Sequence, residues 1–187
     1  MNYYKKYTPY LFLLPALAVL IVFFFIPFFQ TFGLSFFDYS SSIYNPTFNG
    51  VDNYVKLFKE PIFYKVMFNT FMYLVIAVPF LVTFPLFLAI LINQKIRGIT
   101  LYKILLYLPV IVSIVVASIA FKWLYAGQGI LNYLLTIFHL EPIGWLVDTK
   151  WALFSVAIVT IWKGIGYYMM IYLASLMSVP QDLYEAC

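Results

Sequence analysis

The chain has 187 residues, of which 65% are hydrophobic, 22% aromatic and only 10% charged. Soluble domains carry about 25% charged residues, so this composition excludes an ordinary water-soluble fold and indicates an integral membrane protein. The net charge of +4 does not indicate nucleic-acid binding, because the basic residues are scattered and cluster only beside apolar segments. A single cysteine, Cys187, and a single histidine, His139, exclude a disulfide within the chain and a metal site built from either residue type.

Four segments are apolar and long enough to cross the hydrocarbon core of a bilayer, which takes roughly 20 helical residues. They lie near Tyr10–Phe37, Phe68–Asn93, Leu101–Leu124 and Trp151–Met177. The first is too long for a signal peptide and has no small-residue cleavage pattern, so we expect it to remain as a span. The sequence therefore predicts an all-α, polytopic membrane helix bundle with four transmembrane helices.

Prolines occur within the predicted spans, at Pro15, Pro27, Pro79, Pro85 and Pro109. Each removes a backbone donor and tends to kink a helix. Bent helices suit a pathway that opens and closes, yet prolines are also common in membrane helices, where they can simply set the packing geometry. The sequence leaves both interpretations open.

The connection between the first two spans carries a turn signal, Asn49-Gly50, and we expect Asp52 to cap a short helix behind it. One face of that helix would carry the apolar and aromatic residues Tyr54, Leu57 and Phe58. We expect the helix to lie along the membrane surface. In the second long connection, residues 125–150, Trp145 and the neighbouring Trp151 are expected to anchor the chain at the membrane interface.

The positions of Lys and Arg predict the orientation of the spans. One side of the membrane receives both chain ends and a short, densely basic connection, with Lys5, Lys6, Lys95, Arg97 and Lys103. The other side receives as many basic residues, spread over two longer loops that also carry Asp38, Asp52, Glu60, Glu141 and Asp148. Short, dense basic loops stay in the cytoplasm, so the N-terminus is expected there.

Lys163 falls near the middle of the fourth apolar segment, where an unpaired charge costs at least ~2.5–3.5 kcal/mol. A lysine placed there should face the interior of the bundle or an aqueous pathway, and Tyr167, one turn on, shares its face and could hydrogen-bond a polyol. Alternatively, the span begins at Ile158 or later and Lys163 extends outward to the interface. Gly164 and Gly166 permit either close helix packing or room for a solute.

A new helix is expected to begin at the last residues of the chain. Ser178, followed three residues later by Gln181, fits a capping box, and Pro180 is suited to a first helical turn. Asp182 and Glu185 would lie favourably near the positive end of the helix dipole. A polar helix at a membrane exit is suited to docking a partner.

The final stretch, Pro180-Gln-Asp182-Leu-Tyr184-Glu185-Ala186, resembles the opening of the EAA loop of bacterial ABC-importer permeases. Further stretches resemble the carbohydrate-type permeases of this family, such as those for maltose, glycerol-3-phosphate and multiple sugars. They occur in the order of the family and include Leu14-Pro15-Ala16, Leu34-Ser-Phe-Phe-Asp-Tyr39, Phe48-Asn-Gly-Val-Asp-Asn-Tyr54, Phe68-Asn-Thr70, Leu105-Leu-Tyr-Leu-Pro109, Trp123-Leu124 and Trp162-Lys-Gly-Ile-Gly166. Cys187 stands where the family usually has alanine, and the rest of the loop and the final spans do not follow, so we expect a truncated reading frame.

The resemblance implies a type I ABC importer permease fold, with an N-terminal span and loop over residues 1–67 and a partial transmembrane domain over residues 68–187. It implies a pore-forming subunit that moves a sugar or similar polyol-like solute across the cytoplasmic membrane. The implied partners are cytoplasmic ATPase subunits, a second permease subunit, an extracytoplasmic solute-binding protein and membrane lipid. Coupling to the ATPase would rest on Pro180, Asp182, Tyr184, Glu185 and Ala186, and the pathway on Lys163, Gly164 and Tyr167.

Two other kinds of function stay open at this point. An ion-coupled secondary carrier would need an intramembrane ionisable site, for which Lys163 is the only candidate in the predicted spans away from their ends. A four-span chain could also be a non-transporting scaffold or assembly factor. The sequence has no Walker A loop, HExxH motif or nucleophile elbow, so we expect no enzymatic activity and no cofactor, with ATP hydrolysis in a separate subunit.

Overall fold

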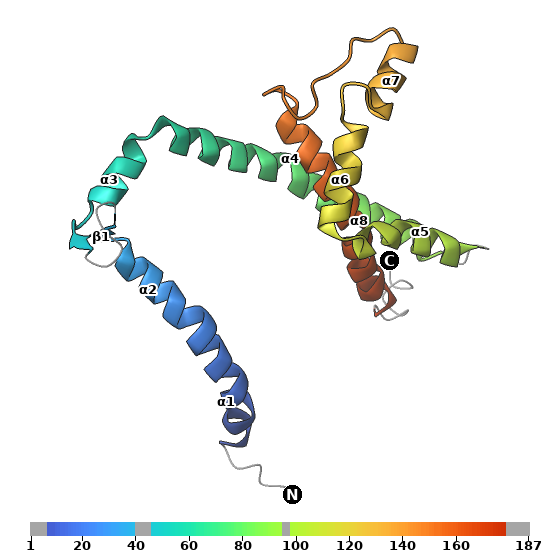
Figure 1. Cartoon of the computed structure of the whole chain (residues 1–187). Coiled ribbons are helices and arrows are strands. Elements are labelled where there is room, and N and C mark those ends of the chain that lie inside the picture. Colours follow the sequence, from blue (N-terminus) through green and yellow to red (C-terminus); the bar gives the residue numbers. More distant parts are fainter. Residues whose placement is uncertain (1–6, 40–45, 95–97, 179–187) are drawn as a thin grey trace, which may run out of the picture. The chain divides into compact units, whose positions relative to one another are not determined.

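The computed structural model describes residues 7–39, 46–94 and 98–178 and is strongly helical (Figure 1). It forms two compact units, residues 1–65 and residues 66–187. Three of the described helical stretches are long and apolar enough to cross a membrane, and a fourth is added when a bent helix pair counts as one span. The prediction of an all-α membrane fold is confirmed.

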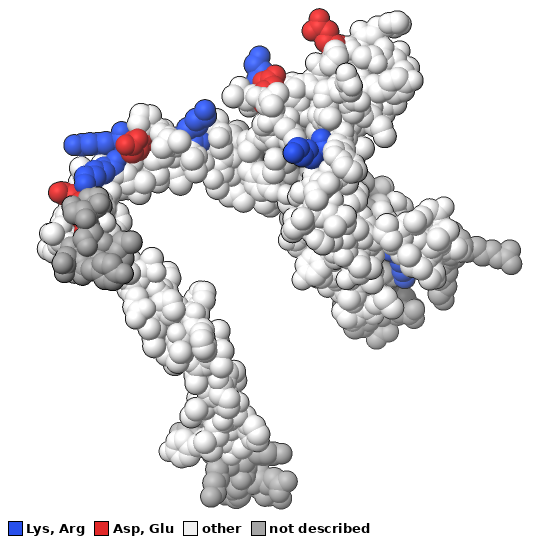
Figure 2. Space-filling view, viewed as in Figure 1, with Lys and Arg blue, Asp and Glu red and all other residues white. Residues whose placement is uncertain are grey.

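The first span consists of three consecutive helical pieces in the first unit: α1 (Thr8–Leu20), the π-helix η1 (Ile21–Phe25) and α2 (Ile26–Leu34). The wide π turn comes directly before Pro27, whose ring would collide with the carbonyl four residues back in a regular α-helix. No residue of this stretch is buried within the structure, and Figure 2 shows its surface without charged side chains. A helix that is apolar all round belongs in lipid or against other membrane helices.

A short hairpin and helix α3 (Asp52–Lys59) follow the first span. Strands β1 (Phe37–Asp38) and β2 (Thr47–Phe48) pair antiparallel, and Gly50 takes the positive φ of 59° that the predicted turn requires. The prediction that Asp52 caps the helix is wrong, because Val51 holds the cap position and Asp52 is the first helical residue. Its carboxylate still lies near the positive end of the helix dipole.

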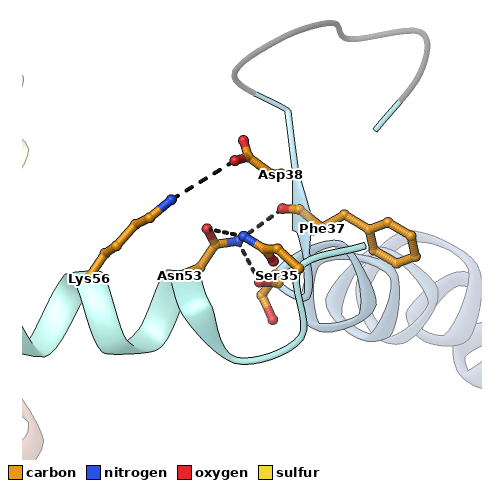
Figure 3. A network of polar contacts seen from close by, with 6 residues as sticks. Ser35, Phe37, Asp38, Asn53 and Lys56 are labelled. Atoms are coloured by element: carbon orange, nitrogen blue, oxygen red, sulfur yellow. Dashed lines mark hydrogen bonds and ion pairs between the residues drawn. The ribbon is translucent and has the colours of Figure 1, made fainter. Parts of the chain in front are cut away.

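Side-chain amides and charges hold α3 against the end of α2 (Figure 3). The Nδ2 of Asn53 donates to the backbone oxygens of Ser35 at 2.8 Å and Phe37 at 2.9 Å. The ammonium of Lys56 lies 3.9 Å from the carboxylate of Asp38. The loop helix is therefore fixed to its own unit through backbone acceptors.

Of the three residues predicted on one face of α3, Tyr54 makes the contacts with the end of the first span. The hydroxyl of Tyr54 lies 2.5 Å from that of Ser35, and its ring contacts Phe36. Phe58 stays largely exposed, with its ring edge-on to that of Phe63 at 5.4 Å, and Leu57 is also exposed.

Helices α4 (Pro61–Ile92) and α8 (Ala152–Met177) are the two long spans that contribute to the second unit. The α8 bounds match the predicted fourth span. Helix α4 begins seven residues before the predicted Phe68, with Pro61 in its first turn, where its missing N–H costs nothing. It continues through Pro79 and Pro85, both of which lie inside the helix.

The third predicted span is not one helix. It forms α5 (Ile99–Ile111) and α6 (Ile114–Leu124), and the chain bends by 96° between them. Pro109 weakens the last turn of α5, and Val112 is extended with ψ of 130°. The hydroxyl oxygen of Ser113 then accepts a hydrogen bond from the Val115 N–H at 3.2 Å and caps a new helix.

Helices α5 and α8 pack against each other in the second unit (Figure 1). A Cβ added to Gly166 would collide with the backbone of Leu106 in α5, so this contact requires glycine. The buried residues of the adjoining cluster come from α4 and α8: Ala89, Ile92, Met169 and Leu173. The core of the unit thus combines close backbone approach at Gly166 with a buried apolar cluster of small and large side chains.

The connection between α6 and α8 contains a further helix, α7 (Ile130–Ile137), and is organised by one buried amide. The Nδ2 of Asn132 donates to the backbone oxygens of Ala126, Gly127 and Ile143, and its Oδ1 accepts from the Ile143 N–H and the Trp145 indole. All these donor–acceptor distances lie between 2.9 and 3.3 Å. Asn132 is only 2% exposed, so its amide satisfies backbone groups of this irregular loop that would otherwise need water as a hydrogen-bond partner.

Trp145 and Trp151, predicted as interface anchors, belong to an aromatic group at the N-terminal end of α8. The Trp145 ring lies 5.7 Å from that of Tyr125 and 5.8 Å from that of Trp151. The Tyr125 hydroxyl donates to the backbone oxygen of Ser155 at 2.9 Å, and burial raises the pKa of this phenol. The phenol therefore stays protonated as a donor throughout the neutral range.

Candidate functional site

The intramembrane lysine of α8 is bound to the break between α5 and α6. The Nζ of Lys163 donates to the backbone oxygens of Pro109 at 3.4 Å, Val110 at 3.3 Å and Val112 at 2.5 Å. Helix α8 places the lysine there because it packs along α5 next to Gly166, which lets the two backbones approach closely.

This arrangement matches three donors with three acceptors. The last carbonyls of a helix have no partner within the helix and carry the negative end of its dipole. An ammonium group has three N–H donors and no acceptor. Hydrogen bonds to a charged group contribute about 1.5–3 kcal/mol each, so three of them offset the ~2.5–3.5 kcal/mol cost of a lysine at the centre of a span.

The structure decides between the two sequence interpretations of Lys163 only in part. Helix α8 is continuous from Ala152, six residues before Ile158, so Lys163 lies well inside a regular helix. Lys163 is half-buried and its ammonium points to the α5 carbonyls. Lys163 therefore faces a neighbouring helix and has backbone partners. These partners could not be predicted from the sequence, because every residue has a carbonyl oxygen.

Gly164 and Tyr167, the other two predicted pathway residues, lie in different surroundings on α8. A Cβ added to Gly164 would come within 2.7 Å of the Leu81 side chain of α4. Tyr167 is 51% exposed and its ring contacts that of Tyr168. For Gly166 the close-packing interpretation is confirmed, and Gly164 also lies against a neighbouring helix.

A cavity of about 360 Å³ lies between α6 and α8, on the loop side of Lys163. Its walls are mostly apolar, with polar groups supplied by Ser118, Lys122 and Thr160. The Thr160 hydroxyl also accepts a hydrogen bond from Tyr73 of α4 at 2.6 Å. Hydroxyl groups beside aromatic and aliphatic walls are the chemistry that a polyhydroxylated solute needs.

The residues predicted to couple to an ATPase, Pro180, Asp182, Tyr184, Glu185 and Ala186, lie outside the described residues. So does Gln181 of the expected capping box, while the Ser178 hydroxyl donates back to the Ser175 carbonyl at 2.7 Å. Within residues 7–39, 46–94 and 98–178 no group of three or more acidic, histidine or cysteine side chains could hold a metal ion.

Two polar residues that organise the second unit, Ser113 and Asn132, were not singled out from the sequence. Ser113 follows Pro109 inside an apolar run, a pattern that signals the end of one helix and the start of another. Asn132 stands between apolar residues of a loop helix and carries no comparable signal.

Comparison with known proteins gives a consistent result. No family model matches the chain. The chain is 38% identical over 187 residues to the probable ABC transporter permease protein YurN of Bacillus subtilis and 34% identical over 186 residues to the lactose transport system permease protein LacF of Rhizobium radiobacter. The matches cover 97% and 98% of this chain but 64% and 62% of those proteins, so the chain spans less than two thirds of their length.

A solved structure of a bacterial ABC transporter involved in the import of the acidic polysaccharide alginate has the same fold. The TM-score is 0.79 at 25% identity, and the match covers 97% of this chain and 62% of that one. The residues described above therefore lie in a known architecture, and the chain is similar to ABC transporter permease proteins, among them one of a lactose transport system.

Proposed function

We propose that the chain forms part of the membrane pathway of an ATP-driven importer for a sugar or similar polyol-like solute. The observation that carries the proposal is the match over nearly the whole chain to a lactose permease protein, together with the fold of an alginate importer. The apolar helices and the hydroxyl-lined cavity between α6 and α8 are compatible with this role.

The partners follow from the same proposal. They are cytoplasmic ATPase subunits, a second permease subunit and an extracytoplasmic solute-binding protein, all within a bilayer. A structural neighbour was solved in complex with an alginate-pentasaccharide-bound periplasmic protein, which supports the last of these. ATP hydrolysis is assigned to the ATPase, because this chain lacks a phosphate-binding loop.

The proposed orientation places the N-terminus and residues 179–187 in the cytoplasm, with the chain crossing the cytoplasmic membrane several times. The densely basic connection beside Arg97 supports this assignment through the positive-inside rule. Under this orientation Pro180, Asp182, Tyr184, Glu185 and Ala186 are available to contact an ATPase, as the resemblance implies.

For the pathway, we assign Tyr167 as the residue that contacts solute, since its side chain is exposed on α8. Gly164 allows α8 to lie close to Leu81 of α4. Lys163 holds α8 to the end of α5 through backbone carbonyls and so positions the part of α8 that carries Tyr167. Replacing Tyr167 with Phe removes the hydroxyl and should raise the KM for uptake with little change in the amount of protein in the membrane.

The test is uptake of a panel of radiolabelled mono- and oligosaccharides by cells that carry or lack the gene. The proposal expects loss of uptake of one sugar or a few related sugars, restored by a plasmid copy. Uptake should stop when the cellular ATP supply is blocked while an ion gradient is maintained. Uptake that needs only the ion gradient would instead support a secondary carrier, and unchanged uptake of every sugar would support a scaffold.

A further inference from the structure

We propose that the Lys163 ammonium is a tethered cation, which fills a carbonyl cation site at the break between α5 and α6 and fixes the bend there. Three backbone oxygens from one short stretch, residues 109–112, converge on its Nζ. Carbonyl oxygens at the end of a broken membrane helix are the ligands with which ion-coupled carriers hold Na⁺. Here the cation bound by the carbonyls is the ammonium group of Lys163 and not a free ion.

Among the described residues, the hydrogen-bond partners of the Lys163 ammonium are all backbone carbonyls. None of the residues of α5, α6 or α8 is Asp or Glu. No carboxylate on these three helices therefore competes for the ammonium, and among the described residues its charge faces peptide dipoles.

The same contacts explain how the bend persists. Val112 is extended, and its carbonyl, freed from helical bonding, is the nearest partner of the lysine at 2.5 Å. If the chain continued as one helix through residues 112 and 113, this carbonyl would turn to bond within the helix. Lys163 thus favours the broken form over the straight one.

A filled cation site also bears on energy coupling, a point that rests on the proposed function. A covalently held ammonium leaves no vacancy for a coupling ion at this break, so residues 109–112 should not supply a Na⁺ site. This agrees with ATP as the energy source.

The experiment uses the full chain, purified in nanodiscs, and compares the wild type with Lys163→Ala, Lys163→Met and Lys163→Arg. The melting temperature of each variant is measured from its tryptophan fluorescence at a series of n-propylammonium chloride concentrations. We expect Lys163→Ala and Lys163→Met to melt well below the wild type. Lys163→Arg, which keeps a donor cation, should recover at least about half of the loss.

Chemical rescue separates a tethered cation from a side chain that merely fills space. Propylammonium should raise the melting temperature of Lys163→Ala in a saturable manner, as ligand linkage requires. Tetramethylammonium, which carries the same charge but has no N–H donor, should not. The matched control is Lys65→Ala, which removes an exposed helical lysine without a hydrogen bond to the described residues, and should show neither loss nor rescue.

Three results would overturn the proposal: wild-type stability of Lys163→Met, equal rescue by the two cations, or no rescue at all. If Lys163→Ala fails to fold, the comparison of Lys163→Arg with Lys163→Met decides, and equal destabilisation of these two contradicts a cation site. Because the assay measures stability and not uptake, its failure leaves the proposed transport function untouched.

Discussion

Asn132 holds the loop between α6 and α8 through both ends of its amide, with three backbone carbonyls on one side and two N–H donors on the other. Asn132→Asp keeps the shape of the side chain but replaces its donating NH₂ group with an oxygen. That oxygen would face three backbone carbonyls and could donate no hydrogen bond to them. Because each buried group left unsatisfied costs about 1–3 kcal/mol, we expect a loss of at least ~3 kcal/mol in stability. Thermal unfolding followed by circular dichroism measures this loss.

The matched control is Thr136→Val in the same loop helix. The Thr136 hydroxyl is exposed and bonds only to the Tyr133 carbonyl, so its loss should change stability by less than about 0.5 kcal/mol. Equal effects of the two substitutions would show that Asn132 does not organise the loop.

Gly166→Ala tests the close contact of α8 with α5. The added methyl group would meet the backbone of Leu106, which cannot move aside as a side chain can, so we expect a loss of about 1–3 kcal/mol. Gly33→Ala is the matched control, because that helical glycine has open space around its Cα. There alanine should be neutral or stabilise the helix by up to ~1 kcal/mol. Chemical or thermal denaturation of both variants gives the comparison, and a neutral Gly166→Ala would contradict the packing.

Single residues were predictable from the sequence where their chemistry conflicts with their surroundings. A lysine inside an apolar run is visible at once, and so Lys163 was identified before its partners were known. The partners were not predictable, because backbone carbonyls are present at every residue and only the fold selects three of them.

At the scale of elements, the broken span is the feature that hydropathy alone could not reveal. A window of apolar residues has the same mean hydropathy whether the helix is straight or bent, so residues 101–124 were predicted as one span. The local signals, Pro109 and Ser113, concern backbone donors and caps and not hydrophobicity. The straight-run prediction succeeded for α8, which has no proline in its interior.

Electron paramagnetic resonance distances can measure the bend directly. Spin labels at Leu101 and Trp123, both exposed, would be about 33 Å apart in a straight helix at 1.5 Å per residue. With the chain bent by 96°, we expect a separation roughly two thirds as long. The native Cys187 is first replaced with Ser so that only the two introduced cysteines are labelled.

A control pair at Val156 and Tyr167 in the uninterrupted helix α8 should give the straight-helix distance of about 16 Å between its backbone positions. A 101–123 distance near the straight value would contradict the break, and with it the setting in which Lys163 finds its acceptors.

At the scale of the whole molecule, an ordered set of weak motifs carried more information than any single one. Leu105-Leu-Tyr-Leu-Pro109 or Trp162-Lys163-Gly164 alone would mean little among apolar segments, yet their order matched the family that the comparisons support. The solute was not predictable, because apolar walls and scattered hydroxyl groups do not distinguish one sugar from another.

Charge reversal near the C-terminal end tests the proposed assembly. Glu185→Lys should reduce co-purification of the ABC ATPase several-fold, because it reverses the charge of this residue in the proposed coupling helix. Glu141→Lys makes the same charge change in the loop predicted on the other side of the membrane and should leave ATPase association unchanged. Association that withstands Glu185→Lys would remove this residue from the coupling contact.

The most direct measurement for the proposed importer is sugar uptake by proteoliposomes that contain the purified assembly, with ATP inside or outside the vesicles. Import needs ATP on the cytoplasmic face and a solute-loaded binding protein on the other. We expect the sugar to accumulate against its gradient when ATP and the loaded binding protein are supplied on opposite sides, even though no ion gradient is imposed. We expect no accumulation when either of the two is missing. Accumulation that follows an ion gradient without ATP would contradict it.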